Sequence, residues 1–223
     1  MKRSVVFSLL FISKSIFAAG MVPETSVLLV DADKGEASMN VTNTDSTPVL
    51  LYTNIVDLPE SDKNIRLLVS QPVVRVEAGA VQRMRFMLQS PVPLTKEELK
   101  RVTFEGIPPK DKNKEKVSVN IRQDLPVIIH PAGLAQDLTP WTHLTWSKQG
   151  SSLVVANPSN YVVRMTSTFT SLPSGKQGTL NNTYLLPQTS MTLALPSMSD
   201  TKVEFYPASR YGYKGERYVA PLR

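Results

Sequence analysis

The stretch Lys114-Glu115-Lys116-Val117-Ser118-Val119-Asn120-Ile121-Arg122 alternates polar and apolar residues, and it decides how the chain is interpreted. Successive side chains of a β-strand point to opposite faces, so Val117, Val119 and Ile121 form one apolar row. Such a row belongs either to the core of its own domain or to the unfinished sheet of another protein. The lysines before the row are typical of an edge strand that must avoid pairing with itself.

Similar short segments recur along the chain and predict an all-β fold, since no segment has a sustained apolar period of 3.6 residues. Six strands are expected before the row, at 26–30, 37–42, 49–56, 67–76, 81–88 and 101–107. Seven more are expected at 144–148, 153–156, 162–169, 183–186, 191–195, 203–206 and 217–222. A single helical turn is expected at 95–100, where Thr95 and Glu98 have the spacing of a capping box, and the pair Glu97-Glu98 is expected to be solvated.

The strand pattern begins again after His130-Pro131-Ala132-Gly133, which has the composition of a hinge. Two sandwiches of about seven strands fit this length, because immunoglobulin-like domains have about 100 residues. We therefore predict two immunoglobulin-like β-sandwich domains, at residues 20–131 and 132–223. The long strand that enters the hinge favours a fixed angle with a cleft between the domains, and two domains on a flexible tether are the alternative.

Residues 1–19 have the features of a secretory signal peptide. Lys2 and Arg3 form a positive segment, residues 4–13 are apolar, and small residues allow cleavage after Ala18 or Ala19. The apolar run is too short to span a bilayer, which needs about 20 residues. We expect export, with no membrane anchor after cleavage. Because the removed segment carries three cations and no acid, the formal net charge falls from +6 to +3.

The composition excludes several classes of protein. The chain has no cysteine, so disulfides and thiolate metal sites are excluded. The lysines of 110–116 are mixed with acids, which is typical of a solvated loop, and nucleic acid is not expected as a partner. No metalloprotease, nucleophile-elbow or phosphate-loop motif is present. His130 and His143 are the only histidines, and neither has further ligands at suitable spacing, so no metal, cofactor or catalytic residue is predicted.

Several motifs occur in a fixed order along the chain. They are Val41-Thr42-Asn43, the segments 71–79 and 82–86, Phe104-Glu105-Gly106-Ile107-Pro108-Pro109, the alternating run to His130-Pro131, and 156–162. Together they resemble the periplasmic chaperones of the bacterial chaperone-usher pathway, which fold and deliver fimbrial subunits. The resemblance implies two immunoglobulin-like sandwiches in a boomerang arrangement, a periplasmic location, and fimbrial subunits and an outer-membrane usher as partners.

In this family the last strand of the first domain inserts alternate apolar residues into a subunit that lacks its own final strand. Counting back from Pro131 places these residues at Val117, Val119 and Ile121. The alternative is that the three side chains complete the core of the first domain. Each side chain buried in a subunit would contribute roughly 1.5–3 kcal/mol, which would support micromolar or tighter binding before association costs.

The sequence departs from the family pattern at the site for the subunit's terminal carboxylate. The family uses an Arg and a Lys there, and the matching positions hold Val27 and Pro126, which cannot bind a carboxylate. Arg122 is the nearest cation with the same strand parity as Pro126, and a guanidinium suits a bidentate carboxylate contact. Arg122 is therefore the candidate anchor, and a solvated edge arginine is the alternative.

A second departure concerns the polar contact between the domains. The family usually places a Glu, an Arg and an Asp there, and the matching neighbourhoods carry Glu105, His130 and Arg210. An exchange of charges is predicted, in which Arg210 pairs with Glu105 and His130 is the third member. Glu105 is shifted by one residue, however, which turns a strand side chain to the other face.

Two other functions compete with the chaperone. An exported structural or adhesive fimbrial component would use the same sandwich fold, although such a subunit usually has one domain with a missing strand. An exported enzyme of another type would need a pocket of convergent polar groups, which no spacing in this sequence predicts.

Overall fold

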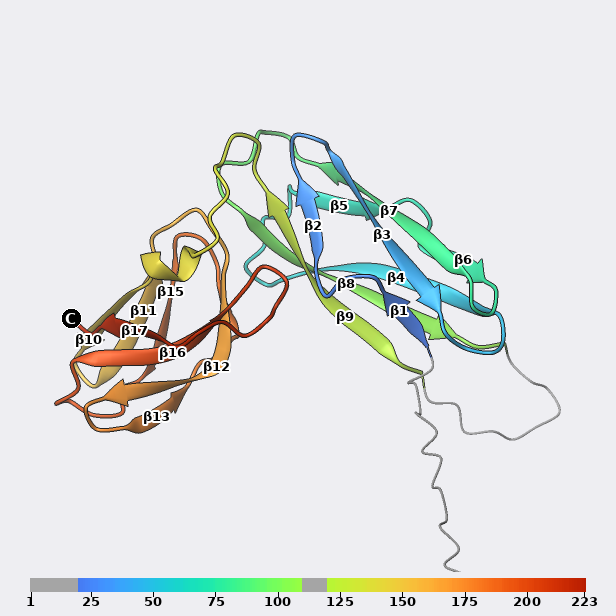
Figure 1. Cartoon of the computed structure of the whole chain (residues 1–223). Coiled ribbons are helices and arrows are strands. Elements are labelled where there is room, and N and C mark those ends of the chain that lie inside the picture. Colours follow the sequence, from blue (N-terminus) through green and yellow to red (C-terminus); the bar gives the residue numbers. More distant parts are fainter. Residues whose placement is uncertain (1–19, 110–119) are drawn as a thin grey trace, which may run out of the picture.

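The computed structural model describes residues 20–109 and 120–223, and it confirms the all-β fold with two sandwiches set at an angle (Figure 1). The first domain contains β1 (Met21–Pro23), β2 (Leu28–Asp31), β3 (Glu36–Asn43), β4 (Val49–Asp57), β5 (Arg66–Val69), β6 (Val73–Val76), β7 (Val81–Gln89), β8 (Glu98–Ile107) and β9 (Arg122–His130). The second contains η1 (Pro140–His143), β10 (Thr145–Gln149), β11 (Ser152–Asn157), β12 (Val163–Leu172), β13 (Lys176–Thr179), β14 (Tyr184–Leu185), β15 (Thr189–Ala194), β16 (Lys202–Ala208) and β17 (Tyr218–Pro221).

The first domain packs a sheet of order β1-β3-β7-β5 against a sheet of order β2-β9-β8-β4-β6. Strand alternation decides which side chains fill the space between them: Met84 and Phe86 of β7 point inward, and Arg83 and Arg85 point outward. The rings of Phe86 and Phe104 meet edge to face with their centroids 6.5 Å apart. Aromatic pairs prefer this geometry over a face-to-face stack, and it helps fix the spacing of the two sheets.

The second domain packs β10-β11-β15 against β13-β12-β16-β17, and β14 pairs with β12. Trp146 of β10 lies at the centre of its core, with ring centroids 5.7 Å from Phe169 and 5.5 Å from Phe205. All three side chains are at most 2% exposed. Cores of this kind are the main source of stability in a chain without disulfides.

The helical turn expected at 95–100 is wrong. β8 already begins at Glu98, and η1 is the only helical element among the residues that the structure describes. The backbone N–H of Glu97 donates to the carbonyl of Asn160 in the second domain at 2.8 Å. A contact between domains therefore replaces the local capping bonds that a helical turn would need.

Both domains use a buried asparagine to link their two sheets. Asn43 ends β3 and Asn157 ends β11, and each is at most 1% exposed. Each side-chain amide nitrogen lies 2.8–3.3 Å from three backbone carbonyls, including one on a strand of the opposite sheet. The carbonyls are those of Thr47, Val76 and Glu77 for Asn43, and those of Tyr161, Leu185 and Leu186 for Asn157.

An apolar cluster joins the two domains. Val27, Leu99 and Ile128 of the first domain pack with Val162 of the second, and Tyr184 adds to the same cluster. Burial of these side chains stabilises one relative placement of the domains. The contact favours the predicted fixed angle over a flexible tether.

Candidate functional site

The strand β9 leaves part of its backbone uncovered. On one side it pairs with β8 from Arg122 to Ile129. On the other side the parallel strand β2 pairs only with Val127–His130. The preceding strand β1 does not extend this pairing, because it pairs with β3 in the opposite sheet and the chain crosses between the sheets at 24–27. Among the described residues, the backbone at 122–126 therefore has no strand partner on this side. Such an edge is available to pair with a strand of another protein.

The inward face of β9 continues the core of the first domain toward the open end of the strand. Val127 and Ile129 on this face are completely buried. Ile121 has the same parity but is 41% exposed, and Gln123 and Leu125 lie between it and the buried part of this face. Val117 and Val119, the other two members of the predicted row, lie outside the described residues. The row as a whole thus stays a prediction.

Arg122, the predicted carboxylate anchor, is exposed at the first position of β9 and lies opposite Glu105 of β8. The two positions at which the family pattern places cations are both buried. Val27 is 2% exposed in the cluster between the domains, and Pro126 is also buried. Both positions thus hold buried apolar side chains that cannot bind a carboxylate, and the role of Arg122 stays a prediction.

A buried carboxylate organises the contact between the domains. Glu97 is 5% exposed; its Oε1 lies 2.9 Å from His130 Nδ1 and 3.5 Å from Arg210 Nη2. Its Oε2 accepts a hydrogen bond from the backbone N–H of Val162 at 2.8 Å. Together with the backbone bond to Asn160, one residue of the first domain thus binds three parts of the second domain and the hinge.

The predicted ion pair between Arg210 and Glu105 is wrong. Glu105 lies opposite Tyr52 and Arg122, at the end of β8 that is far from the hinge, and Glu97 takes its place. The expectation that Glu97 is solvated is also wrong. A carboxylate on a short charged segment is usually exposed, and its bond to Val162 spans 65 residues, so local sequence gave no sign of its burial.

The region between the domains is rich in cations. Burial lowers the pKa of the Arg164 guanidinium, and the positive charge of Arg101 lowers it further. Arg164 Nη1 donates to the carbonyl of Arg210 at 3.1 Å. At the end of β2, a hydrogen bond from Lys34 lowers the pKa of Asp31; burial opposes this effect, and nearby cations add to it.

A concavity of about 560 Å³ lies along the uncovered edge of β9. The first domain contributes the segment 22–26 together with Gln123 and Leu125 of β9. The second domain contributes Tyr211 and Tyr213, from the loop that joins β16 to β17 and reaches toward the first domain in Figure 1. These tyrosines are 46% and 74% exposed. Concave surfaces lined by aromatic and uncharged groups are typical of binding sites.

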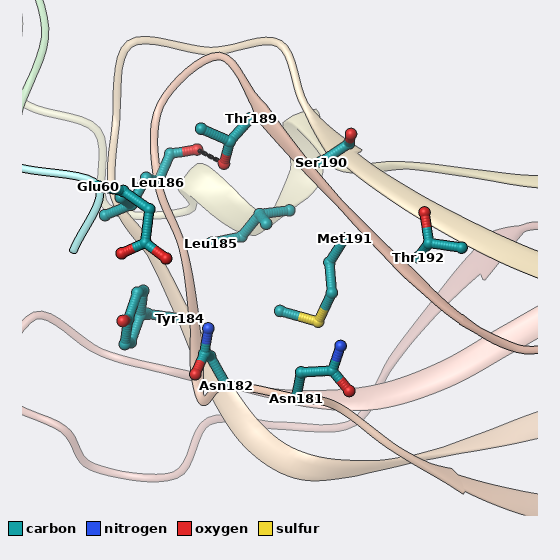
Figure 2. Close-up of a pocket in the computed structure, with 10 residues that line it drawn as sticks. All are labelled: Glu60, Asn181, Asn182, Tyr184, Leu185, Leu186, Thr189, Ser190, Met191 and Thr192. Atoms are coloured by element: carbon teal, nitrogen blue, oxygen red, sulfur yellow. Dashed lines mark hydrogen bonds between the residues drawn. The ribbon is translucent and has the colours of Figure 1, made fainter. Parts of the chain in front are cut away.

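A smaller cavity of about 290 Å³ lies in the second domain beside β14 and β15 (Figure 2). Leu185 and Met191 of the core line it together with the amides of Asn181 and Asn182, and Glu60 of the first domain is the one carboxylate among its described lining residues. Among the described lining residues, this carboxylate has neither a histidine nor a second carboxylate beside it, so they offer no acid-base pair. Within residues 20–109 and 120–223 no group of three acidic, histidine or cysteine side chains could hold a metal ion. The described part of the chain also has no helix of the length and hydrophobicity that crossing a membrane requires.

An exposed apolar patch covers the outward face of the five-stranded sheet in the first domain. Leu50 lies opposite Ile107, and Tyr52 lies opposite Val73. The four side chains are between 38% and 52% exposed. We call these four residues the outer apolar patch. Contiguous apolar surface of this kind marks a site of contact with another protein.

Comparisons with known proteins agree on one family. Residues 20–135 match the family model for the pili and flagellar-assembly chaperone, PapD N-terminal domain, and residues 139–218 match that for the pili assembly chaperone PapD, C-terminal domain. The uncharacterized fimbrial chaperone YhcA of Escherichia coli (strain K12) is 62% identical over 225 residues, which cover 100% of both chains. Chaperone protein MrkB of Klebsiella pneumoniae is 27% identical over 208 residues, 88% of each chain. A chain of the solved complex of the SafA pilin with the SafB chaperone of Salmonella enterica has a TM-score of 0.74 at 20% identity, covering 94% of this chain and 99% of that one.

Proposed function

The chain belongs to the family of pili assembly chaperones, and we propose that it binds fimbrial subunits by lending them the β9 strand and the residues before it. One observation carries this proposal: among the described residues the backbone of 122–126 lacks a strand partner on one side, and Ile121, which has the parity of the inward face of β9, is exposed. A subunit whose sheet lacks a strand would gain both main-chain hydrogen bonds and apolar knobs from this edge. The solved complex of SafB with a pilin supports the same class of partner.

We also propose that the chaperone works in the periplasm and has no catalytic activity. Residues 1–19 have the features of an export signal, and relatives are named fimbrial chaperones. The alternative of a structural or adhesive fimbrial component is not supported, because both matching domain models describe chaperones. The alternative of an enzyme is not supported either, because both matching domain models describe assembly chaperones.

The test is the capture of an unfolded fimbrial subunit of the same bacterium by the chaperone purified from the periplasm. Ile121→Asp should weaken capture at least ~30-fold, because a charge buried in an apolar groove costs a few kcal/mol. The free chaperone should keep its stability, since Ile121 is 41% exposed. Val81→Asp is the matched control, because Val81 is 59% exposed on β7 of the opposite sheet. The proposal is contradicted if the Ile121→Asp and Val119→Asp proteins are folded and still capture the subunit as well as the parent does.

We further propose that the outer apolar patch is the docking surface for the usher. Its residues face away from the core of the first domain, whereas Ile121 has the parity of the inward face, so a bound subunit and an usher would use different faces of one sheet. Tyr52→Ser combined with Val73→Ser should reduce fimbrial assembly in cells and leave subunit capture unchanged. Assembly at the parental level by this double variant would contradict the assignment.

A further inference from the structure

We infer that Tyr211 and Tyr213 of the second domain pack on the bound subunit, over an extended segment that lies along the uncovered half of β9. This inference rests on the proposed function and names a second contact for the same partner. The occupant is one strand of the subunit, and the contact comes from the domain that does not lend a strand.

The position of the concavity relative to the free edge is the first step. Gln123 and Leu125 line the concavity, and both belong to the segment 122–126, whose backbone has no strand partner on that side among the described residues. Strands pair at about 4.8 Å, so a strand added to this edge enters the concavity directly. The tyrosines line the same space from the second domain.

The loop that carries the tyrosines is held in a tight turn. The N–H of Ser209 donates to the carbonyl of Tyr213 at 2.9 Å, and the N–H of Gly212 donates to the carbonyl of Ser209 at 2.8 Å. Gly212 has φ +82°, a conformation that residues with a Cβ rarely adopt. Exposed tyrosines on an ordered turn provide large contact area at a small cost in conformational entropy, as in rigid recognition loops.

The same loop is fixed against the first domain. Arg210 binds the carboxylate of Glu97, and the carbonyl of Arg210 accepts a bond from Arg164 at 3.1 Å. Ser26 Oγ of the first domain donates to the carbonyl of Tyr211. The backbone around both tyrosines is therefore positioned relative to β9 before any partner binds, and Arg210 acts as a positioning residue.

The chemistry of the lining identifies the occupant as a polypeptide strand. Among residues 20–109 and 120–223, no lysine or arginine lines the concavity. Its carboxylate, Glu24, already accepts hydrogen bonds from the backbone and side chain of Asn40 at 2.9 and 3.0 Å. The described part of the lining thus offers no counter-charge to an anionic ligand. What the site offers is unpaired strand backbone and two aromatic rings, which suit an extended chain with apolar or uncharged side chains.

The experiment measures binding of a fimbrial subunit of the same bacterium, diluted from denaturant into purified chaperone. Tyr211→Ala and Tyr213→Ala should each weaken binding about 5- to 20-fold, mainly through faster dissociation, and the double variant should lose more. Phenylalanine at both positions should restore most of the affinity, because contact area is retained. Met198→Ala is the matched control, since Met198 is 66% exposed elsewhere in the second domain.

Contact itself is tested with a photo-crosslinking amino acid. Placed at position 213 it should form an adduct with the subunit, and placed at position 198 it should not. The inference would be overturned if the double tyrosine variant binds the subunit as tightly as the parent while Ile121→Asp abolishes capture. The proposed function would still stand in that case. If the double tyrosine variant and Ile121→Asp both capture the subunit as well as the parent does, the proposed function itself is contradicted. A chaperone dimer that the tyrosine variants dissociate, with subunit binding unchanged, would assign the concavity to a second copy and overturn the inference as well.

Discussion

Single buried amides stabilise each sandwich of this chaperone. Replacing Asn43 or Asn157 by alanine leaves three backbone carbonyls without their side-chain donor, and both sites are almost inaccessible to water. We expect each change to lower the free energy of unfolding by about 2–4 kcal/mol. Urea denaturation followed by tryptophan fluorescence measures the loss for Asn157→Ala, because Trp146 lies in that domain, and circular dichroism measures it for Asn43→Ala.

Asn64→Ala is the control for these variants. The Asn64 amide bonds only the side chain of Asp62 at the surface, so its removal should change the free energy of unfolding by less than about 0.5 kcal/mol. If both Asn43→Ala and Asn157→Ala lower the free energy of unfolding by less than about 1 kcal/mol, the carbonyls must find other donors, through water or through a shift of the surrounding backbone.

Arg122 offers a second prediction at the residue scale. If it binds the terminal carboxylate of the subunit in a desolvated contact, Arg122→Ala should weaken subunit binding by about 2–5 kcal/mol at both low and physiological salt. Arg83→Ala is the matched control, because Arg83 is an exposed arginine of the opposite sheet that bonds Ser38. Binding as tight as that of the parent would place the anchor elsewhere.

At the scale of the element, the pairing of β12 with β13 depends on a glycine. Gly178 lies opposite Phe169, and a Cβ added there would stand 2.2 Å from the ring, which is too close. Glycine ordinarily weakens a strand, so Gly→Ala often stabilises one. Here we expect the opposite sign: Gly178→Ala should cost about 1–3 kcal/mol in urea denaturation, because the displaced ring belongs to the core around Trp146.

The neighbouring change Gln177→Ala removes an exposed side chain from the same strand and should be nearly neutral. Combining Gly178→Ala with Phe169→Leu should cost less than the sum of the two changes, since the smaller side chain leaves room for the methyl group. Strict additivity would show that the ring does not determine the effect.

Strand alternation predicted most elements, but it failed where the chain changes sheets and missed β13, a short polar strand beside β12. The segment 81–88 is β7 almost to the residue. The single strand expected at 67–76 is instead β5 and β6, which lie in opposite sheets on either side of Pro72. Alternation shows which side chains share a face of a strand. It does not show where a strand ends and the chain crosses to the other sheet, because the alternating pattern largely continues through the crossing. The short strand β1 was missed for the same reason, because the chain reaches β2 through such a crossing.

At the scale of the whole molecule, the sequence placed two of the three polar partners between the domains. His130 and Arg210 both contact the carboxylate of Glu97, and the sequence analysis named both because they lie beside recognisable landmarks of the two sandwiches. Their common partner was misassigned to Glu105, since only the three-dimensional packing reveals that Glu97 is buried by the second domain. Local sequence patterns cannot predict which distant residues contact a buried charge.

The ion pair of Glu97 with Arg210 should therefore hold the two domains at their angle. Glu97→Gln and Arg210→Gln each remove one charge from a contact that is largely shielded from water, and each should cost about 1–3 kcal/mol of unfolding free energy. Because the two residues interact, the double variant should cost less than the sum, by about 0.5–3 kcal/mol. Solution scattering should show larger dimensions for all three variants.

Glu105→Gln combined with Arg210→Gln is the matched cycle, and its effects should simply add, because Glu105 lies at the far end of β8. The same Arg210→Gln protein should also bind a fimbrial subunit more weakly than the parent, since Arg210 positions the loop of Tyr211 and Tyr213. Weak coupling to Glu97 with unaltered dimensions would mean that the apolar cluster around Ile128 sets the angle by itself. Coupling to Glu105 instead would restore the pairing that the sequence first predicted.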